Sequence, residues 1–150
     1  MLIEDYRITK VRDYIFEILQ KLLEETIEKY QININFLPNE IDNYSIDKIP
    51  VKTETSIFIT DECICRDVYE FRSRTLYSTQ VDDNLKNIGF YEKFEKKIKE
   101  NNKKGLLPKI DGIESIECLN CGSLNDNETS TAVFSIQVQI EYMEVQDEDD

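Results

Sequence analysis

The segment from Thr131 to Glu144 reads TAVFSIQVQIEYME and is the most regular stretch of the sequence. Its apolar residues alternate with polar ones, as they do in a strand that buries one face and exposes the other. One face carries Phe134, Ile136, Val138, Ile140 and Tyr142, and the other carries Ser135, Gln137, Gln139 and Glu141. We therefore predict a long strand that lies against a core on one side only.

Further strands are predicted on the N-terminal side of this segment. Residues 113–120 and 31–37 are expected to be strands, and the turn-rich residues 122–130 join the last two strands. Residues 57–65 and 67–77 are rich in β-branched and aromatic residues, which predicts either two strands of a meander or one long bent ribbon. Residues 39–55 are polar and read as an extended arm or loop, in which 44–46 could form a short strand.

Two amphipathic helices complete the pattern. Apolar residues recur at spacings of three and four over 4–30 and again over 82–104, where Gly105 and Pro108 mark the end and Gly89 is a candidate kink. The resulting order is α-β-arm-β-β-α-β-β. Packing both helices on one face of a mainly antiparallel sheet is the simplest arrangement, so we predict an α+β fold. Residues 1–144 would form one domain, and 145–150 a disordered acidic tail.

The charge and composition exclude several classes of protein. The 150 residues include 31 acidic and 18 basic ones, for a formal net charge of -13, and there is no histidine. Without histidine there is no Ser-His-Asp or Cys-His pair and no imidazole ligand for a metal. The acidic balance argues against broad binding to nucleic acid. Motifs for phosphate or dinucleotide binding are also missing, so we expect neither an enzyme nor a cofactor.

The cysteines offer one alternative. No secretory signal or membrane-spanning stretch is recognisable, so we expect synthesis in the cytoplasm, reduced thiols and no membrane association. Cys63 and Cys65 lie two apart and Cys118 and Cys121 three apart, and together they could supply four thiolates to zinc. Alternation puts the first pair on one face of a strand but the second pair on opposite faces. Small buried residues are the simpler interpretation.

Two groups of charged residues are candidates for contacts between subunits. Glu70, Arg72 and Arg74 share the polar face of the strand predicted at 67–77, and exposed cross-strand pairing is their simpler interpretation. The second helix carries a basic segment that includes Lys93, Lys96 and Lys97, interleaved with glutamates. It reads most simply as a solvated surface. On a strongly acidic subunit, however, it is also a candidate to contact an identical neighbour in a head-to-tail ring.

Seven short stretches, in order, resemble one family. They are residues 40–50 (EIDNYSIDKIP), 72–74 (RSR) with Tyr77, 87–94 (NIGFYEKF), 105–108 (GLLP), 113–117 (IESIE), 122–124 (GSL) and 134–142 (FSIQVQIEY). The set resembles the tail terminator, or tail-completion, proteins of tailed phages that infect Gram-positive bacteria, often labelled minor capsid proteins. The four cysteines and the acidic tail lie outside that pattern.

The resemblance implies a structural role in a phage tail or a phage-derived tail-like particle. Its subunits would form a ring, commonly a hexamer, that caps the tail tube, ends its polymerisation and joins the head-side connector. The implied partners are the chain itself, the tail tube protein and, as further candidates, the sheath protein and the connector. DNA would pass through the channel unbound, and an acidic wall would repel it. Asp42, Tyr44 and Pro50 of the arm are further candidates for contacts between subunits.

Two alternatives remain open on the sequence. A head-side neck or completion protein would have a similar structural role, but it would separate with capsids rather than with tails. A small zinc-binding adaptor would use Cys63, Cys65, Cys118 and Cys121, and removing the metal would unfold it.

Overall fold

A computed structural model describes residues 6–23, 32–34, 37, 43–51, 54–57, 62–76, 81–120, 123–128 and 131–145. Their elements are α1 (Arg7–Leu23), β1 (Ile32–Ile34), β2 (Asn43–Ile49), β3 (Glu54–Ile57), β4 (Glu62–Leu76), α2 (Val81–Lys104), β5 (Ile113–Cys118), β6 (Ser123–Glu128) and β7 (Thr131–Val145). The predicted α+β class is confirmed. Of the acidic tail predicted at 145–150, Val145 is the last residue of β7, and 146–150 lie outside the described residues.

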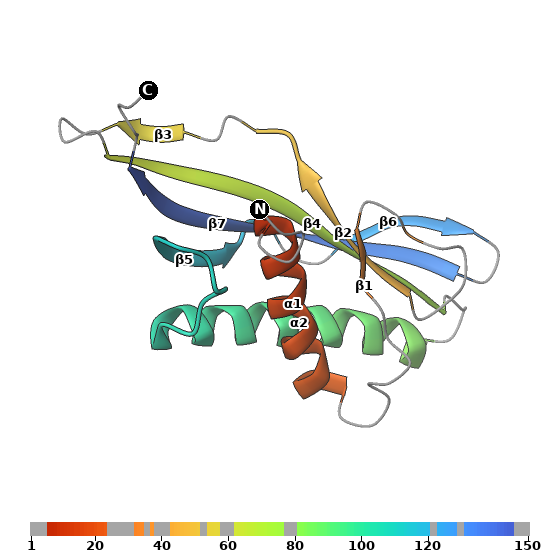
Figure 1. The fold of residues 1–150 in the computed structure, drawn as a ribbon. Coiled ribbons are helices and arrows are strands. Elements are labelled where there is room, and N and C mark those ends of the chain that lie inside the picture. Colours follow the sequence, from red (N-terminus) through yellow and green to blue (C-terminus); the bar gives the residue numbers. More distant parts are fainter. Residues whose placement is uncertain are drawn as a thin grey trace.

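The sheet is built on one long pair of strands. β4 and β7 are antiparallel and pair along their whole length, from Glu62 opposite Val145 to Leu76 opposite Thr131. Figure 1 shows them as the twisted ribbon that runs through the molecule. β2 and β3 pair with the edge of β4 that is turned away from β7. β5 and β6 pair with the edge of β7 that is turned away from β4. The main path through the sheet is β1-β2-β4-β7-β5.

The prediction of a mainly antiparallel sheet is only partly right. β1 runs parallel to β2, with Ile32 opposite Tyr44, so the sheet is mixed. Alternation could not reveal this, because a strand shows the same period of two whichever way it runs.

Three boundaries also differ from the expectations. Within the arm expected at 39–55, the strand suggested at 44–46 is longer than expected, since β2 pairs with β4 from Asn43 to Ile49. The ribbon predicted at 57–77 contains one continuous strand, β4, which begins at Glu62, while β3 ends at Ile57. The predicted turn at 122–130 contains β6, a third segment paired with β7. For β2 and β6, pairing with a long neighbour stabilises as a strand a polar segment that has weak strand preference by itself.

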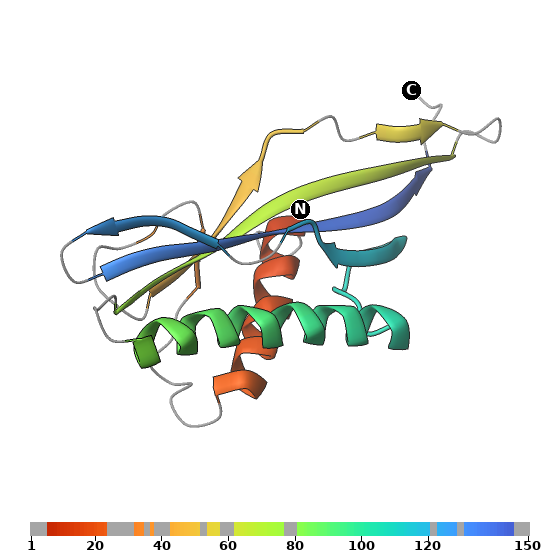
Figure 2. The same cartoon turned by 180° about the vertical axis from the view of Figure 1, so that it is seen from behind.

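Both helices lie on the same side of the sheet, as predicted; Figure 2 shows them together beneath it. Phe71 of β4 is at the centre of the core, where its ring stacks on Tyr44 of β2 and on Phe94 of α2, at centroid distances of 5.7 and 5.2 Å. The predicted apolar face of β7 is buried from Phe134 to Tyr142. α2 continues through Gly89. Within the described residues, no helix is long and apolar enough to cross a membrane.

A close backbone contact joins the loop after α2 to the end of β7. Gly112 has a φ of 75°, and its carbonyl accepts a hydrogen bond of 2.8 Å from the amide of Met143. A Cβ added at Gly112 would lie 2.2 Å from the carbonyl oxygen of Met143. Both the positive φ and the close approach therefore require glycine here.

We predict opposite effects of alanine at two glycines. Gly112→Ala should lower the free energy of unfolding by about 2 kcal/mol or more, because the left-handed backbone costs about 1–2 kcal/mol and the Cβ clash adds to it. Gly89→Ala, with no atom within 4 Å of the added Cβ, should raise that free energy by about 0.5–1 kcal/mol, because alanine favours a helix. Urea unfolding measures both, and equal effects would contradict the assignment of the loop.

Candidate functional site

The face of the sheet that the helices leave uncovered carries the first group of candidate residues. Glu70, Arg72 and Arg74 alternate with the buried Tyr69, Phe71 and Ser73, so they lie on this outer face, as predicted. The Arg72 Nε lies 2.7 Å from the Asp47 carboxylate of β2, and Ser45 donates a hydrogen bond of 2.7 Å to the other carboxylate oxygen. Arg72 is therefore held in place by its neighbouring strand.

A second polar group continues along the same face toward β5. The Gln139 side chain accepts from Arg66 at 3.4 Å and donates to the Glu117 carboxylate at 3.2 Å. Small residues lie beneath the long side chains: Ser45, Val68 and Ser135 are buried on this face. The outer face is thus a layer of positioned charged and amide groups over a buried floor.

The basic residues of α2 lie on the opposite side of the molecule. Tyr91, Phe94 and Ile98 turn toward the sheet and are buried. Lys93 and Lys96 are exposed and Lys97 is half-buried. None of these lysines forms an ion pair within 4 Å with another described residue. The two groups of candidates therefore form two different surfaces on opposite sides of the sheet.

The three candidates in the arm have different outcomes. Tyr44 is only 5% exposed and packs in the core, so its ring is not available to a neighbouring subunit, and we remove it from the candidate surface. The cause is the pairing of β2, which turns Tyr44 and Ile46 toward the helices. Pro50 is exposed just after β2. Asp42 lies outside the described residues.

A buried carboxylate that the sequence analysis did not select joins α1 to the sheet. The Asp67 side chain is 1% exposed and lies 2.6 Å from the Arg7 Nε and 3.8 Å from the Lys48 Nζ. It also accepts hydrogen bonds from the hydroxyls of Tyr69, at 2.8 Å, and Tyr142, at 3.5 Å. The Arg7 guanidinium stacks over the Tyr142 ring at 4.7 Å. The sequence did contain one signal for this buried carboxylate: alternation in β4 places Asp67 on the same face of the strand as apolar residues.

This group shifts the pKa values of its members. Burial alone lowers the pKa of Arg7, but the hydrogen bond and the charge of Asp67 outweigh it, so the pKa rises. Burial, followed by the nearby Asp67 charge, raises the pKa values of Tyr69 and Tyr142. Tyr91, elsewhere in the core, also has a pKa raised by burial. These tyrosines are held neutral in the folded chain.

The cysteines do not assemble into one site among the described residues. Cys63 and Cys65 share the buried face of β4, as predicted, with their sulfur atoms 3.3 Å apart. Cys118 lies on β5 opposite Val138, whereas Cys65 is opposite Tyr142, so the register separates them along β7. No group of three potential metal ligands occurs in the part of the chain that the structure describes. Cys121 lies outside it.

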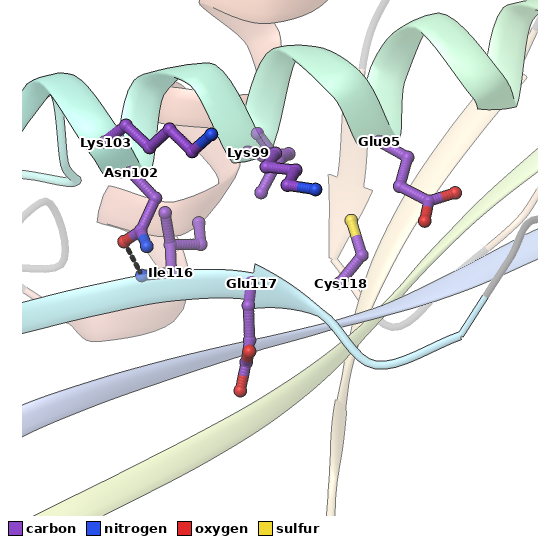
Figure 3. A pocket seen from close by; sticks show the side chains of 8 residues that line it. Glu95, Lys99, Asn102, Lys103, Ile116, Glu117 and Cys118 are labelled. Atoms are coloured by element: carbon purple, nitrogen blue, oxygen red, sulfur yellow. Dashed lines mark hydrogen bonds between the residues drawn. The ribbon is translucent and has the colours of Figure 1, made fainter.

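Cys118 instead points into a cavity of about 310 Å³ between α2 and β5. Figure 3 shows its thiol directed toward the helix, near Lys99, while Glu117 points to the other side of the strand. The Asn102 Oδ1 accepts a hydrogen bond of 3.0 Å from the Ile116 amide, which satisfies a backbone donor on the free edge of β5. This side of the cavity therefore protects a strand edge.

Comparison with protein families and with curated proteins finds no match to this chain. The two charged surfaces and the resemblance of the sequence segments are therefore the grounds for proposing a function.

We predict that the contact between Arg7 and Asp67 is a main attachment of α1. Arg7→Met should lower the free energy of unfolding by about 1–3 kcal/mol, because it leaves a buried carboxylate without its closest cation. Arg12→Met is the matched control: its partner Asp13 is 61% exposed, and exposed pairs contribute less than about 1 kcal/mol. Urea unfolding compares the two, and an equal loss would show that burial of Asp67 has no special weight.

Alkaline pH should destabilise the fold through its buried tyrosines. Tyr69, Tyr91 and Tyr142 have pKa values above the ordinary 10.0 when folded. Above about pH 10 the unfolded chain therefore releases protons that the folded chain retains, and stability falls as pH rises. These three groups contribute a slope of up to about 4 kcal/mol per pH unit, and Tyr14, whose pKa burial also raises, adds to it.

Urea unfolding between pH 9 and 11 measures this slope, and absorbance at the tyrosinate band reports ionisation. Tyr91→Phe should reduce the slope by up to about 1.4 kcal/mol per pH unit, because one of these protons is removed. Ionisation of all tyrosines near their ordinary pKa in a chain that stays folded would contradict the prediction.

Proposed function

We propose that this chain is the subunit of a homo-oligomeric ring, a hexamer by resemblance, that terminates the tail tube of a phage or of a phage-derived particle. The ring would cap the tube, stop its polymerisation and present a surface to the head-side connector. The sequence segments that resemble tail terminators support this role. So does the lack of histidine, which leaves a structural role simpler than a catalytic one.

The observation that carries the proposal is the presence of two different charged surfaces on opposite sides of one sheet, an outer face of mixed charge and a side of α2 that bears lysines. A ring with head-to-tail contacts uses two different surfaces of each subunit, whereas a two-fold dimer uses the same surface twice. Here the outer face presents Glu70, Arg72, Arg74 and Asp47. α2 presents Lys93 and Lys96, which form no ion pair with another described residue. The outer face also has a buried floor and positioned side chains, which reduces the entropy lost on association.

The charge fits passage of DNA through such a ring. A net charge of -13 repels phosphate, and clustered lysines in the lumen would retard DNA. The basic side of α2 would therefore face a neighbouring subunit rather than the channel. The zinc-binding alternative gains no support from the described cysteines, which the sheet register separates.

The purified chain should form a closed oligomer that negative-stain images show as a ring and that binds tail tubes. Lys93→Glu with Lys96→Glu should weaken association at least tenfold, because like charges placed across an interface cost several kcal/mol. Lys103→Glu with Lys104→Glu makes the same charge change at the end of α2 and should have little effect. Mass photometry and cosedimentation with tail tubes measure both. A chain that stays monomeric at every concentration and never binds tubes would contradict the proposal.

A further inference from the structure

Two thiols lie in direct contact near one end of the long strand pair. The Cys63 and Cys65 sulfur atoms are 3.3 Å apart on the buried face of β4, where the two residues are 2% and 1% exposed. Neither takes part in a disulfide in this structure. Cys118 is held elsewhere by the register of β5. Among the described cysteines, Cys63 and Cys65 are therefore the two that are placed to react with each other.

The hydrogen bonds of the pair show where each thiol proton lies. The Cys65 thiol donates to a carboxylate oxygen of Glu144 at 3.8 Å. The proton between the two sulfur atoms therefore belongs to Cys63, and the Cys65 sulfur accepts it. Because Glu144 is exposed, its carboxylate links the buried pair to solvent. The pair thus has a contact through which a thiol proton can leave.

The backbone permits a bond between the two sulfur atoms, but only under strain. Alternate residues of a strand have Cα atoms about 6.6–6.8 Å apart, which is twice the rise per residue. Disulfides usually join Cα atoms about 4.4–6.8 Å apart, so Cys63 and Cys65 lie near the upper limit. Pairing on both sides holds β4 extended here, since Ile64 lies opposite Ser56 of β3 and Met143 of β7. A disulfide would have to draw the two Cα atoms together against this pairing.

We propose that Cys63 and Cys65 form a reversible oxidation site, at which a low-molecular-weight disulfide converts the two thiols into a disulfide within β4. In the first step one cysteine attacks the small disulfide, which breaks its S–S bond, releases one small thiol and leaves a mixed disulfide. In the second step the other cysteine attacks the protein sulfur of that mixed disulfide and releases the second small thiol. Each protein thiol proton ends on a released thiol, so the small disulfide is reduced as the pair is oxidised.

The position of the pair gives the oxidant access and makes the bond labile. Cys63 is the second residue of β4 and lies opposite Glu144, the next-to-last residue of β7, at the end where β3 joins the sheet (Figure 1). Strand ends open more easily than the middle of a sheet, so local opening exposes the thiols. A strained disulfide is readily reduced, and one that closes so short a loop stabilises the fold little. The pair is suited to reversible oxidation rather than to a permanent crosslink.

A metal fits the pair less well than a disulfide does. Structural zinc takes four ligands, and no three potential ligands come together in the part of the chain that the structure describes. The site is also independent of the proposed ring, because neither thiol lies on the outer face of the sheet or on α2.

Intact-mass spectrometry of the full chain after treatment with oxidised glutathione tests the site. Cys118→Ser with Cys121→Ser removes the other two thiols, and a chelator keeps metal ions away. We expect the chain to lose the mass of two hydrogen atoms, with no glutathione attached, and to regain it in excess reduced glutathione. Adding Cys63→Ser or Cys65→Ser should abolish this loss and leave at most one bound glutathione. A chain that keeps both thiols, binds two glutathiones or stays oxidised in excess reduced glutathione overturns the inference.

Hydrogen exchange of the oxidised chain tests where the strain is placed. The amides of Ile64 and Met143 should exchange at least tenfold faster than in the reduced chain, because drawing the Cα atoms together weakens the pairing around them. The amides of Thr75 and Ala132, at the opposite end of the same two strands, are the matched control and should change less than twofold. The urea midpoint should fall on oxidation and return on reduction.

Three results of these measurements would contradict the inference. Unchanged exchange at Ile64 and Met143 would show that the bond forms without strain. An equal increase at Thr75 and Ala132 would show general unfolding rather than a local site. A higher urea midpoint after oxidation would show a stabilising crosslink instead of a labile one.

Discussion

The pairing of β4 with β7 is the constraint on which the rest of the structure depends. Fifteen residues of each strand are matched without a register shift. If β4 slipped by one residue along β7, Phe71 would turn outward and Arg72 would enter the core, so the core pins the register. Every other strand except β1 pairs directly with one of these two. The same register decides which charges share the outer face.

The helices complete the fold in different ways. α2 packs aromatic and aliphatic side chains on the sheet, with Phe94 and Ile98 fully buried. α1 buries Val11, Ile15 and Leu19, but it also reaches the sheet through a polar contact, in which Arg7 meets a carboxylate beneath the surface. A buried ion pair contributes orientation more surely than stability, because removing two charges from water is costly.

Much of the fold could be predicted because it depends on local periodicity. The alternation of Phe134 to Tyr142 gave the longest strand and its buried face, and the spacing of Tyr91, Phe94 and Ile98 gave α2. β2 was predicted only in part, as a short strand at 44–46, and β6 was missed, because their polar residues become strand only beside a long partner. Tyr44 was placed on the surface for the same reason, since only the pairing with β4 shows that its side faces the helices.

The sequence by itself determined the faces: which residues of β4, β7 and α2 are buried, and that Glu70, Arg72 and Arg74 share a polar side. These follow from periods of 2 and 3.6 residues, which a chain carries in its order alone. Only the tertiary structure decided which faces meet. The mixed sheet, the separation of Cys118 from Cys63 and Cys65, and the contact between Arg7 and Asp67 all depend on how residues far apart in the chain are placed. Such contacts depend on strand register and direction, which local periodicity does not encode.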